Sequence, residues 1–559
     1  MDKQMTAKEI LEFYDEITIG EQLCEDTLFF TLFEKQFLFI APSRDDLSSE
    51  AEVYLYNDSF MDYPHILLRE TNITEGRVLP KGTYRWVCLF EQDSIVNSIL
   101  SYDEKIYDCI DRLIELLNMS SVEKEREFQK EFLYYWNSES IGDNSFQVYL
   151  DQDDQVAEMD VYFSKSIVRL TDRKIALSDL EETAKGERKW VHHLEKDAFF
   201  IPIKDCRGVL PPHRGYKWTA KDLHEIIYGK QIEHISDETF EKIKTLIPKT
   251  QDVLLVFGMR TETTNIAFTL NMKCKNRVGH SLLEKILTDI TAVEPMFTKR
   301  KDYSYLSEQI GNDIGAKRKK VLLVGAGSLG SYVALELVKN GFTYLKIYDD
   351  DTLTEENTLR WAYEGYGIGK SKVLILKNML EWLHPQILID SCNKKLDTES
   401  LTEELKDTDI IIFTIGNSDA QLKFNKVLKQ QVFTKPVLYV WLEEGGLYSH
   451  ILFVDYRKPG CFECLYTDTS GEKVNNRARK NTGLAVEKGM IRNGCGGTRA
   501  AYGTSILLKT TAALLDTLHE LDRNKLTNNT LIDITTTRVG ASDIIFPMEA
   551  CNCCGNNAE

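Results

Sequence analysis

Long hydrophobic runs and an excess of positive charge are both missing from this 559-residue sequence. Its apolar stretches, such as Val321–Val324 and Ile410–Phe413, are far too short to cross a bilayer, and the polar amino terminus has no signal-peptide pattern. The 68 lysines and arginines are outnumbered by 87 acidic residues, which gives a formal net charge of -19. Because nucleic-acid backbones and anionic membranes attract basic surfaces, we expect neither as a direct partner.

Cysteine is also scarce for a disulfide-stabilised protein, with twelve residues in the whole chain. Together with the missing secretion pattern, this composition predicts reduced thiols and a cytoplasmic protein. Cysteines that cluster in the sequence then become candidates for metal binding or catalysis. Internal repeats and low-complexity linkers are absent as well, and the length predicts roughly two to four globular domains.

Three regions differ in the pattern of their apolar residues. Residues 1–145 combine short alternating segments with a helical pattern, which predicts an α+β domain. Residues 146–305 predict a mixed α/β linker domain, with strands at Asp252–Met259 and Asn265–Met272. Residues 306–559 alternate strands and helices, a pattern typical of a doubly wound parallel sheet.

A glycine-rich turn follows the first predicted strand of the third region, Lys320–Val324. Gly325 permits a tight turn, Gly327 lets the backbone approach a phosphate, and Gly330 lets the next helix pack on the strand. The amino end of that helix then faces the anion. The motif predicts a bound dinucleotide or ATP, and by itself it is more typical of a nicotinamide dehydrogenase.

Polar residues after the second predicted strand favour ATP. Asp349 begins an acidic run there, and Asn357, Arg360 and Lys372 follow. A dinucleotide enzyme needs one acid at this place for a ribose, whereas adenylation also needs Asn, Arg and Lys side chains that face the triphosphate. The ordered set therefore favours an adenylation site.

This run resembles the ThiF/MoeB/HesA family of E1-like enzymes, whose pattern is G-x-G-x-x-G, then D-x-D, N-x-x-R and K. The resemblance covers the third region of the chain. It implies that Asp349 contacts ribose, that Asp351 belongs to the same site, and that the phosphates contact Asn357, Arg360 and Lys372. ATP is then the nucleotide, with Mg²⁺ as its metal.

The family usually has a magnesium-binding Asp in the turn after the fourth strand, where this sequence has Gly416. Asp419 follows shortly after and could supply the carboxylate, since Mg²⁺ needs only one or two carboxylates besides phosphate oxygens. Asp419 could equally cap the helix that begins there. Both interpretations are open at the level of the sequence.

Two pairs of cysteines lie far apart in the third region. Cys461 and Cys464 form one C-x-x-C pair, and Cys551 and Cys554 form the other. Each pair suits two corners of a tetrahedral thiolate site, and the E1-like family carries the same arrangement near the chain end. We predict a structural Zn²⁺ site of these four residues, although Cys553 makes the second pair ambiguous. The alternative is that the tail cysteines bind nothing.

A further candidate, Cys495, follows the polar segment Ser470–Arg492 and precedes a predicted helix, Ser505–Leu515. A helix amino terminus and the nearby Arg499 would stabilise a thiolate. The run C-x-x-T-R resembles the catalytic-cysteine turn of autophagy-type activating enzymes, which implies that Cys495 takes the acyl group as a thioester. The alternative is a small buried packing residue.

The first region contains the pair Pro64-His65, and Cys88 follows at the end of a predicted strand. These motifs resemble the prokaryotic relatives of E2-like domains, which implies that Cys88 is the carrier cysteine. His65 either shapes that site or caps a turn, and a core cysteine is the alternative for Cys88. We expect Cys109 to lie in the core, because it falls on the apolar face of its helix.

Together the resemblances imply an E2-like domain, a linker domain and an E1-like domain in one chain, as in the fused conjugation enzymes of bacterial CBASS anti-phage operons. ATP would adenylate the carboxyl terminus of a protein, Cys495 and then Cys88 would carry it as a thioester, and an amine would receive it. The implied substrate is a ubiquitin-like protein or a cGAS/DncV-like nucleotidyltransferase, and the implied assembly is a homodimer.

Three other functions are open. A ThiF/MoeB-type sulfur-carrier activator needs adenylation and Zn²⁺ but no carrier domain. A nicotinamide oxidoreductase is motivated only by the glycine turn, and a non-catalytic scaffold by the missing acid at Gly416.

Overall fold

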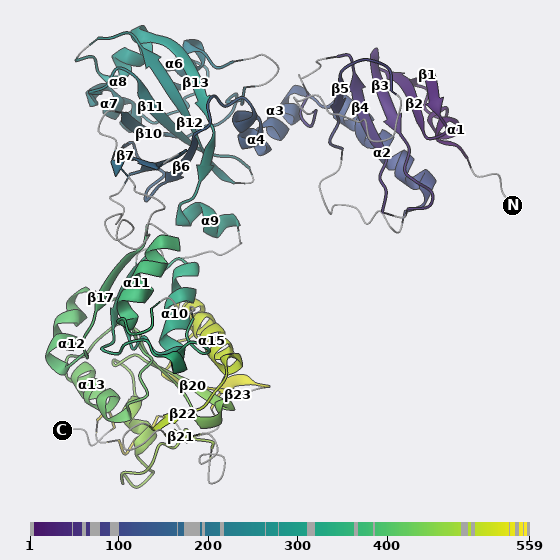
Figure 1. The fold of residues 1–559 in the computed structure, drawn as a ribbon. Helices are drawn as coiled ribbons and strands as arrows, with labels where there is room; N and C mark the ends of the chain where they lie inside the picture. The colour runs from purple at the N-terminus through teal and green to yellow at the C-terminus, as the bar shows by residue number, and fades with distance from the viewer. Residues whose placement is uncertain are drawn as a thin grey trace. The chain divides into compact units, whose positions relative to one another are not determined.

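The computed structural model contains two compact units, which are drawn in Figure 1. The first is built from residues 1–173 and 191–301, and the described part of the second lies in residues 302–559. Within both units, no described helix has the length and apolar character that a membrane crossing requires. The predicted division into three domains stays a prediction.

The described residues are 5–46, 48–58, 63–66, 79–89, 100–164, 166–172, 191–192, 196–212, 217–262, 264–277, 279–309, 319–362, 367–383, 386–481, 490–492, 498–535, 537–542, 547–551 and 553–555.

The amino-terminal sheet of the first unit is antiparallel, with its five strands in the order β1-β2-β3-β4-β5. Helix α2 packs on this sheet and begins at a capping box made by Ser101 and Glu104. Its residues Ile106, Ile110 and Leu113 recur at helical spacing and are buried, so this apolar stripe joins the helix to the sheet. The elements are α1 (Ala7–Leu11), β1 (Ile17–Cys24), β2 (Thr27–Leu32), β3 (Lys35–Ile40), β4 (Glu52–Tyr56), β5 (Tyr84–Trp86) and α2 (Tyr102–Asn118).

A second sheet in the same unit has the strand order β13-β12-β11-β10-β7-β8-β6-β14, with β9 beside β7. It is mixed, because β10 and β11 are parallel whereas β11 and β12 are antiparallel. Phe132 and Trp136 of helix α4 are buried against Phe268 of this sheet.

The helices of this part are α3 (Ser121–Lys130), α4 (Phe132–Ser138), α6 (Ala220–Tyr228), α7 (Asp237–Thr245) and α8 (Leu282–Glu284). The strands are β6 (Ser145–Tyr149), β7 (Ala157–Ser164), β8 (Ile167–Thr171), β9 (Val191–His192), β10 (Asp197–Ile203), β11 (Val253–Arg260), β12 (Asn265–Cys274), β13 (Ile290–Met296) and β14 (Thr298–Arg300).

The sheet of the second unit has the order β17-β16-β15-β18-β19-β20-β23-β24. The first five of these strands are parallel, as predicted, whereas β20, β23 and β24 are antiparallel to their neighbours. The prediction of an all-parallel sheet is therefore wrong at one edge, where the sheet becomes mixed. The strands are β15 (Lys320–Val324), β16 (Tyr344–Tyr348), β17 (Leu388–Cys392), β18 (Ile410–Phe413), β19 (Val437–Leu442), β20 (Tyr448–Val454), β23 (Thr530–Thr535) and β24 (Val539–Ala541).

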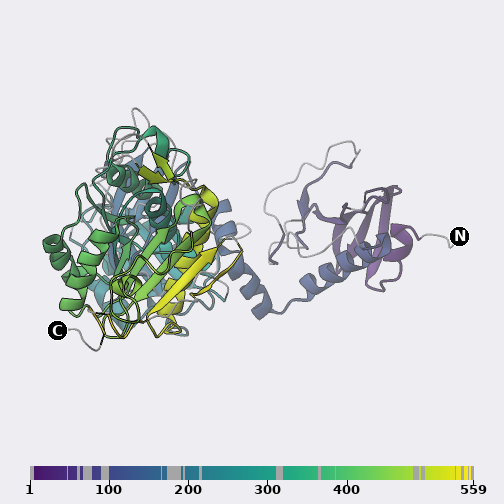
Figure 2. The ribbon, with the colours of Figure 1, turned by 90° about the horizontal axis from the view of Figure 1, so that it is seen from below.

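Helices cover both faces of this sheet, as a doubly wound fold requires. Val321 and Leu323 of β15 pack with α10, α11 and α15, whereas Leu322 and Val324 pack with α12 and α13. Figure 1 shows these two layers of helices, and Figure 2 shows them from below. The helices are α9 (Tyr303–Gln309), α10 (Ser328–Lys339), α11 (Lys372–Leu383), α12 (Thr398–Glu404), α13 (Ser418–Gln430) and α15 (Thr504–Asp522), and a small separate sheet pairs β21 (Met490–Arg492) with β22 (Thr498–Ala500).

Candidate functional site

The glycine turn joins β15 to α10 at the carboxyl edge of the parallel strands. Gly325 has a φ of +104°, in the left-handed region that favours glycine. Gly327 is the N-cap of α10, and an added Cβ there would meet nothing within 4 Å. At Gly330 an added Cβ would overlap the backbone oxygen of Gly325, so the helix passes over the turn more closely than a larger residue allows.

A cavity of about 620 Å³ opens beside this turn. Most of the residues predicted for the nucleotide site line it, and Gly330 does not, because it packs against the turn itself. The predicted residues in the lining are Gly325, Gly327, Asp349, Asp351, Asn357, Arg360 and Lys372.

Asp349 holds the glycine turn in place. Its carboxylate accepts hydrogen bonds from the backbone N–H of Ala326 at 2.6 Å and from that of Asp351 at 2.8 Å. Burial raises the pKa of Asp349, and the two backbone hydrogen bonds act in the opposite direction. The carboxylate that is predicted to contact ribose is thus fixed in the wall of the cavity.

The two cations of the motif have different surroundings. Lys372 is only 6% exposed, and its Nζ lies 3.0 Å from Asp351 Oδ2. The guanidinium of Arg360 lies 5.3 Å from the ring centre of Tyr502, which also lines the cavity. Both side chains present positive charge to the same cavity, which suits the phosphates of a nucleotide.

Asp419 lies in the first turn of α13 and is not among the residues that line the cavity. Its side chain is 76% exposed and forms an ion pair with Lys423 at 2.8 Å. The helix is capped by Asn417, whose side chain accepts the N–H of Ala420 at 3.0 Å. The capping interpretation of Asp419 is therefore wrong, and its role toward Mg²⁺ stays a prediction.

Several cavity residues were missed by the sequence analysis. Lys394 and Lys395 follow β17, and Glu444 follows β19. The sequence did contain a signal for them, because the residues after every parallel strand reach the same edge of the sheet. Tyr502, which precedes α15, had no such signal.

The four predicted zinc ligands come together in the second unit. All four sulfurs lie within 4.8 Å of one another, with 3.9 Å between Cys461 and Cys551 and 3.4 Å between Cys464 and Cys554. Zn–S bonds of about 2.3 Å in a tetrahedral site imply sulfur–sulfur distances of roughly 3.8 Å, so the four thiols fit this metal. Cys553 is outside the set.

Cys495 lies outside the described residues. The strands on either side of it, β21 and β22, pair with each other, and Arg499 belongs to β22. Helix α15 begins only at Thr504, after this strand. The placement of Cys495 close to a helix amino terminus stays a prediction, and so does its role as acyl acceptor.

The candidate carrier cysteine and the histidine of the P-H pair are neighbours in the first unit. Cys88 is half-buried and donates its backbone N–H to the carbonyl of His65 at 2.8 Å. The His65 ring lies between Glu127 at 3.3 Å and Glu131 at 3.2 Å. Burial alone would lower the pKa of His65, but the hydrogen bonds and charges of Glu131 and Glu127 raise it. Cys109 is fully buried, which confirms its prediction as a core residue.

The doubly wound sheet, the glycine turn and the polar cavity define an E1-like adenylating class. In agreement, residues 312–544 match the pattern of the ThiF family. This part of the chain is a ThiF-family domain, and the protein is an E1-like activating enzyme.

The particular relatives extend beyond that domain. The chain is 23% identical over 516 residues to the ATP-dependent ubiquitin transferase-like protein Cap2 of Vibrio cholerae serotype O1, and the match covers 84% of this chain and 86% of Cap2. It is 26% identical over 184 residues to ubiquitin-like modifier-activating enzyme 5 of Bombyx mori, which is 30% of this chain and 46% of that protein. The solved structure of E. coli MccB with ATP matches 43% of this chain and 67% of MccB, with a TM-score of 0.34 and 17% identity.

Proposed function

We propose that this protein uses ATP to activate the carboxyl terminus of a protein and to join it to an amine. The observation that carries the proposal is the cavity beside the glycine turn, which gathers the fixed carboxylate of Asp349 and the cations of Arg360 and Lys372. Similarity to Cap2, a ubiquitin transferase-like protein, over most of both chains supports the same reaction class.

In the first step, a carboxylate oxygen of the substrate attacks the α-phosphorus of ATP, and pyrophosphate leaves. Arg360 and Lys372 would offset the charge that develops on the leaving phosphates. One carboxylate oxygen from each of Asp349, Asp350 and Asp351 lies within 4.8 Å of the other two, and carboxylate oxygens are ligands that Mg²⁺ prefers. Bound Mg²⁺ would neutralise phosphate charge.

In the following steps, the thiolate of Cys495 attacks the acyl-adenylate and AMP leaves. Cys88 then attacks this thioester and frees the thiol of Cys495. Finally an amine attacks the second thioester, which forms an amide and frees Cys88. Two thioesters keep the activated acyl group from water until the acceptor arrives.

We further propose that the substrate tail belongs to a cGAS/DncV-like nucleotidyltransferase or to a ubiquitin-like protein, in anti-phage defence. The resemblance of the whole chain to the fused CBASS conjugation enzymes supports this substrate class, and it also supports a homodimer. Residues 1–145 would be the E2-like domain and 146–305 the linker domain. The four gathered cysteines would hold a structural Zn²⁺.

The test is pyrophosphate exchange and thioester trapping on full-length protein with ATP, Mg²⁺ and a purified nucleotidyltransferase of the proposed class. We expect exchange in the unaltered protein and in Cys495→Ala, but a reducible adduct only when Cys495 is present. Cys88→Ala should retain the adduct on Cys495 and form no conjugate. Cys24→Ala, a change at an exposed cysteine, is the matched control.

A sulfur-carrier activator is the second candidate, because it would use the same cavity and the same zinc site. It predicts that Cys88→Ala leaves every product unchanged. If the unaltered protein shows no pyrophosphate exchange with any candidate tail, adenylation itself is refuted.

A further inference from the structure

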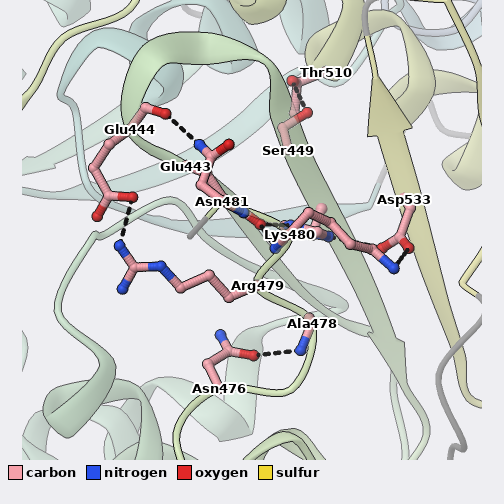
Figure 3. A network of polar contacts seen from close by, with 11 residues as sticks. Glu443, Glu444, Ser449, Asn476, Ala478, Arg479, Lys480, Asn481, Thr510 and Asp533 are labelled. Atoms are coloured by element: carbon pink, nitrogen blue, oxygen red, sulfur yellow. Dashed lines mark hydrogen bonds and ion pairs between the residues drawn. The ribbon is translucent and has the colours of Figure 1, made fainter. Parts of the chain in front are cut away.

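A short turn after β19, Glu443–Gly446, contacts the chain on both sides of the segment that contains Cys495. On the near side, Glu443 is 4% exposed, and its carboxylate accepts the backbone N–H of Lys480 at 2.8 Å and that of Asn481 at 2.7 Å. Figure 3 shows Lys480 and Asn481 beside Glu443. A buried carboxylate therefore fixes the backbone just before residues 482–500.

The far side of the same segment also meets this turn. Gly445 donates its N–H to the carbonyl of Ala501 at 2.8 Å. Gly446 has a φ of +66°, and an added Cβ there would lie 2.9 Å from Cβ of Tyr502. Residues 480–481 are thus hydrogen-bonded to Glu443, Ala501 is hydrogen-bonded to Gly445, and Tyr502 lies close to Gly446 of the same turn.

A fully buried histidine of strand β20, His450, contacts the turn through Glu443. His450 of β20 has its Nε2 2.7 Å from Glu443 Oε1 and its Nδ1 2.8 Å from Asp533 Oδ1. Lys480 Nζ lies 3.1 Å from the other oxygen of Asp533. Since buried carboxylates need paired charge, His450 and Lys480 allow Glu443 and Asp533 to stay ionised there.

The turn also reaches the nucleotide cavity. Glu444 and Tyr502 both line that cavity, and Arg360 lies over the ring of Tyr502. Arg479, next to the fixed backbone, forms an ion pair with Glu444 at 2.9 Å, as Figure 3 shows. The backbone on each side of the cysteine segment is therefore tied to the wall of the site where the acyl-adenylate would form.

We propose that Glu443 and His450 are positioning residues for the transfer of the acyl group from adenylate to cysteine. This inference rests on the proposed function and concerns its second step alone. Attack on an adenylate requires the reacting atoms to be held about 3–3.5 Å apart, so the ends of the segment must be fixed relative to the cavity. Glu443 and His450 do not line the cavity, so adenylation does not use them directly.

Glu443→Gln tests the proposal, because the amide keeps the size of the side chain but replaces one of the two accepting oxygens with a donor. We expect hydrogen exchange at the amides of Lys480 and Asn481 to become at least about tenfold faster. With a cGAS/DncV-like nucleotidyltransferase as the probe, pyrophosphate exchange should stay within about twofold, while adduct formation on Cys495 should slow by about tenfold or more, the scale that a small misplacement produces.

Ser449→Ala is the matched control, since it removes the buried hydrogen bond to Thr510 at 2.6 Å, on the strand that carries His450, but leaves the turn intact. It should keep both rates in the same proportion as the unaltered protein. Arg479→Ala serves if Glu443→Gln does not fold, because it removes an exposed contact of the same turn, and it should slow adduct formation selectively.

An unchanged rate of adduct formation in Glu443→Gln, or an equal fall of both rates, would overturn the inference. For Arg479→Ala the same two results would overturn it. If the unaltered protein exchanges pyrophosphate but forms no adduct, the transfer step of the proposed function is itself wrong. The positioning role of Glu443 and His450 is then wrong as well. This case is distinguishable because the adduct is already missing in the unaltered protein.

Discussion

At the scale of single residues, Lys372 is the buried cation of the nucleotide cavity, and its ammonium lies 3.0 Å from Asp351. We expect Lys372→Ala to reduce the rate of pyrophosphate exchange by about 100-fold, the usual effect of removing one group that stabilises transition-state charge. Lys339→Ala is the control, because that lysine is exposed and lies outside the cavity. Equal rates of pyrophosphate exchange in the two variants would show that Lys372 does not contribute to adenylation.

His450 provides a pH-dependent prediction. Burial alone would lower the pKa of His450, but hydrogen bonds and charges of Asp533 and Glu443 raise it, and Lys480 is the other charge near these carboxylates. A raised pKa means that the stabilisation is complete below the unfolded value of about 6.5 and is lost as pH rises through the higher folded value.

We therefore expect His450→Gln to destabilise the protein most near pH 6, on the order of 3 kcal/mol, because it leaves buried carboxylates without their cation. The difference from the unaltered protein should shrink as pH rises through the raised pKa of the folded histidine. Urea unfolding of the full chain at a series of pH values measures this difference. A difference that is constant across the series would show that the pKa of His450 is the same in the folded and the unfolded protein.

The residues of the cavity also show what a sequence can and cannot reveal. Asp349, Asn357, Arg360 and Lys372 were recognisable because their order is fixed by the path of the chain along one sheet edge. Glu443 and His450 were not, since their roles come from contacts with residues far away in the sequence.

At the scale of secondary-structure elements, the join of β15 and α10 depends on Gly330, whose missing side chain lets the helix approach the oxygen of Gly325. We expect Gly330→Ala to push the helix from the turn and weaken ATP binding by at least about tenfold, a loss of roughly 1.4 kcal/mol. Titration calorimetry with ATP would measure it. Gly503→Ala is the control, because an added Cβ there meets nothing within 4 Å, and its ATP affinity should not change.

The same elements explain why the fold was only partly predictable. Strands β15, β16 and β18 are short buried runs between helices, which is the pattern of a doubly wound sheet, and all are parallel. Strand β20 has the same buried composition, but it runs antiparallel to β19. Strand direction depends on the length and path of the connection, and periodicity alone does not contain it.

At the scale of the whole molecule, the zinc prediction concerns how the end of the chain is attached to the second unit. Cys464 and Cys554 are far apart in sequence, yet their sulfurs lie 3.4 Å apart. A metal bound by both pairs would fix the carboxyl tail, so its removal should lower the melting temperature of the protein. A loss of about 2 kcal/mol would lower it by roughly 4–8 °C for a unit of this size.

Serine substitutions at Cys553 and Cys554 test which of these two neighbouring cysteines binds zinc. Cys554→Ser removes a sulfur of the cluster, whereas Cys553→Ser removes a sulfur outside the cluster, which accepts a hydrogen bond from Asn425 at 3.3 Å and also interacts with Cys461. We expect one zinc per chain in the unaltered protein and in Cys553→Ser, and clearly less in Cys554→Ser, by elemental analysis after dialysis against a chelator. Full zinc content in Cys554→Ser together with a loss of zinc in Cys553→Ser would show that Cys553, and not Cys554, is the ligand. Because both serines are the same size and lie next to each other, a general effect on folding would lower both alike.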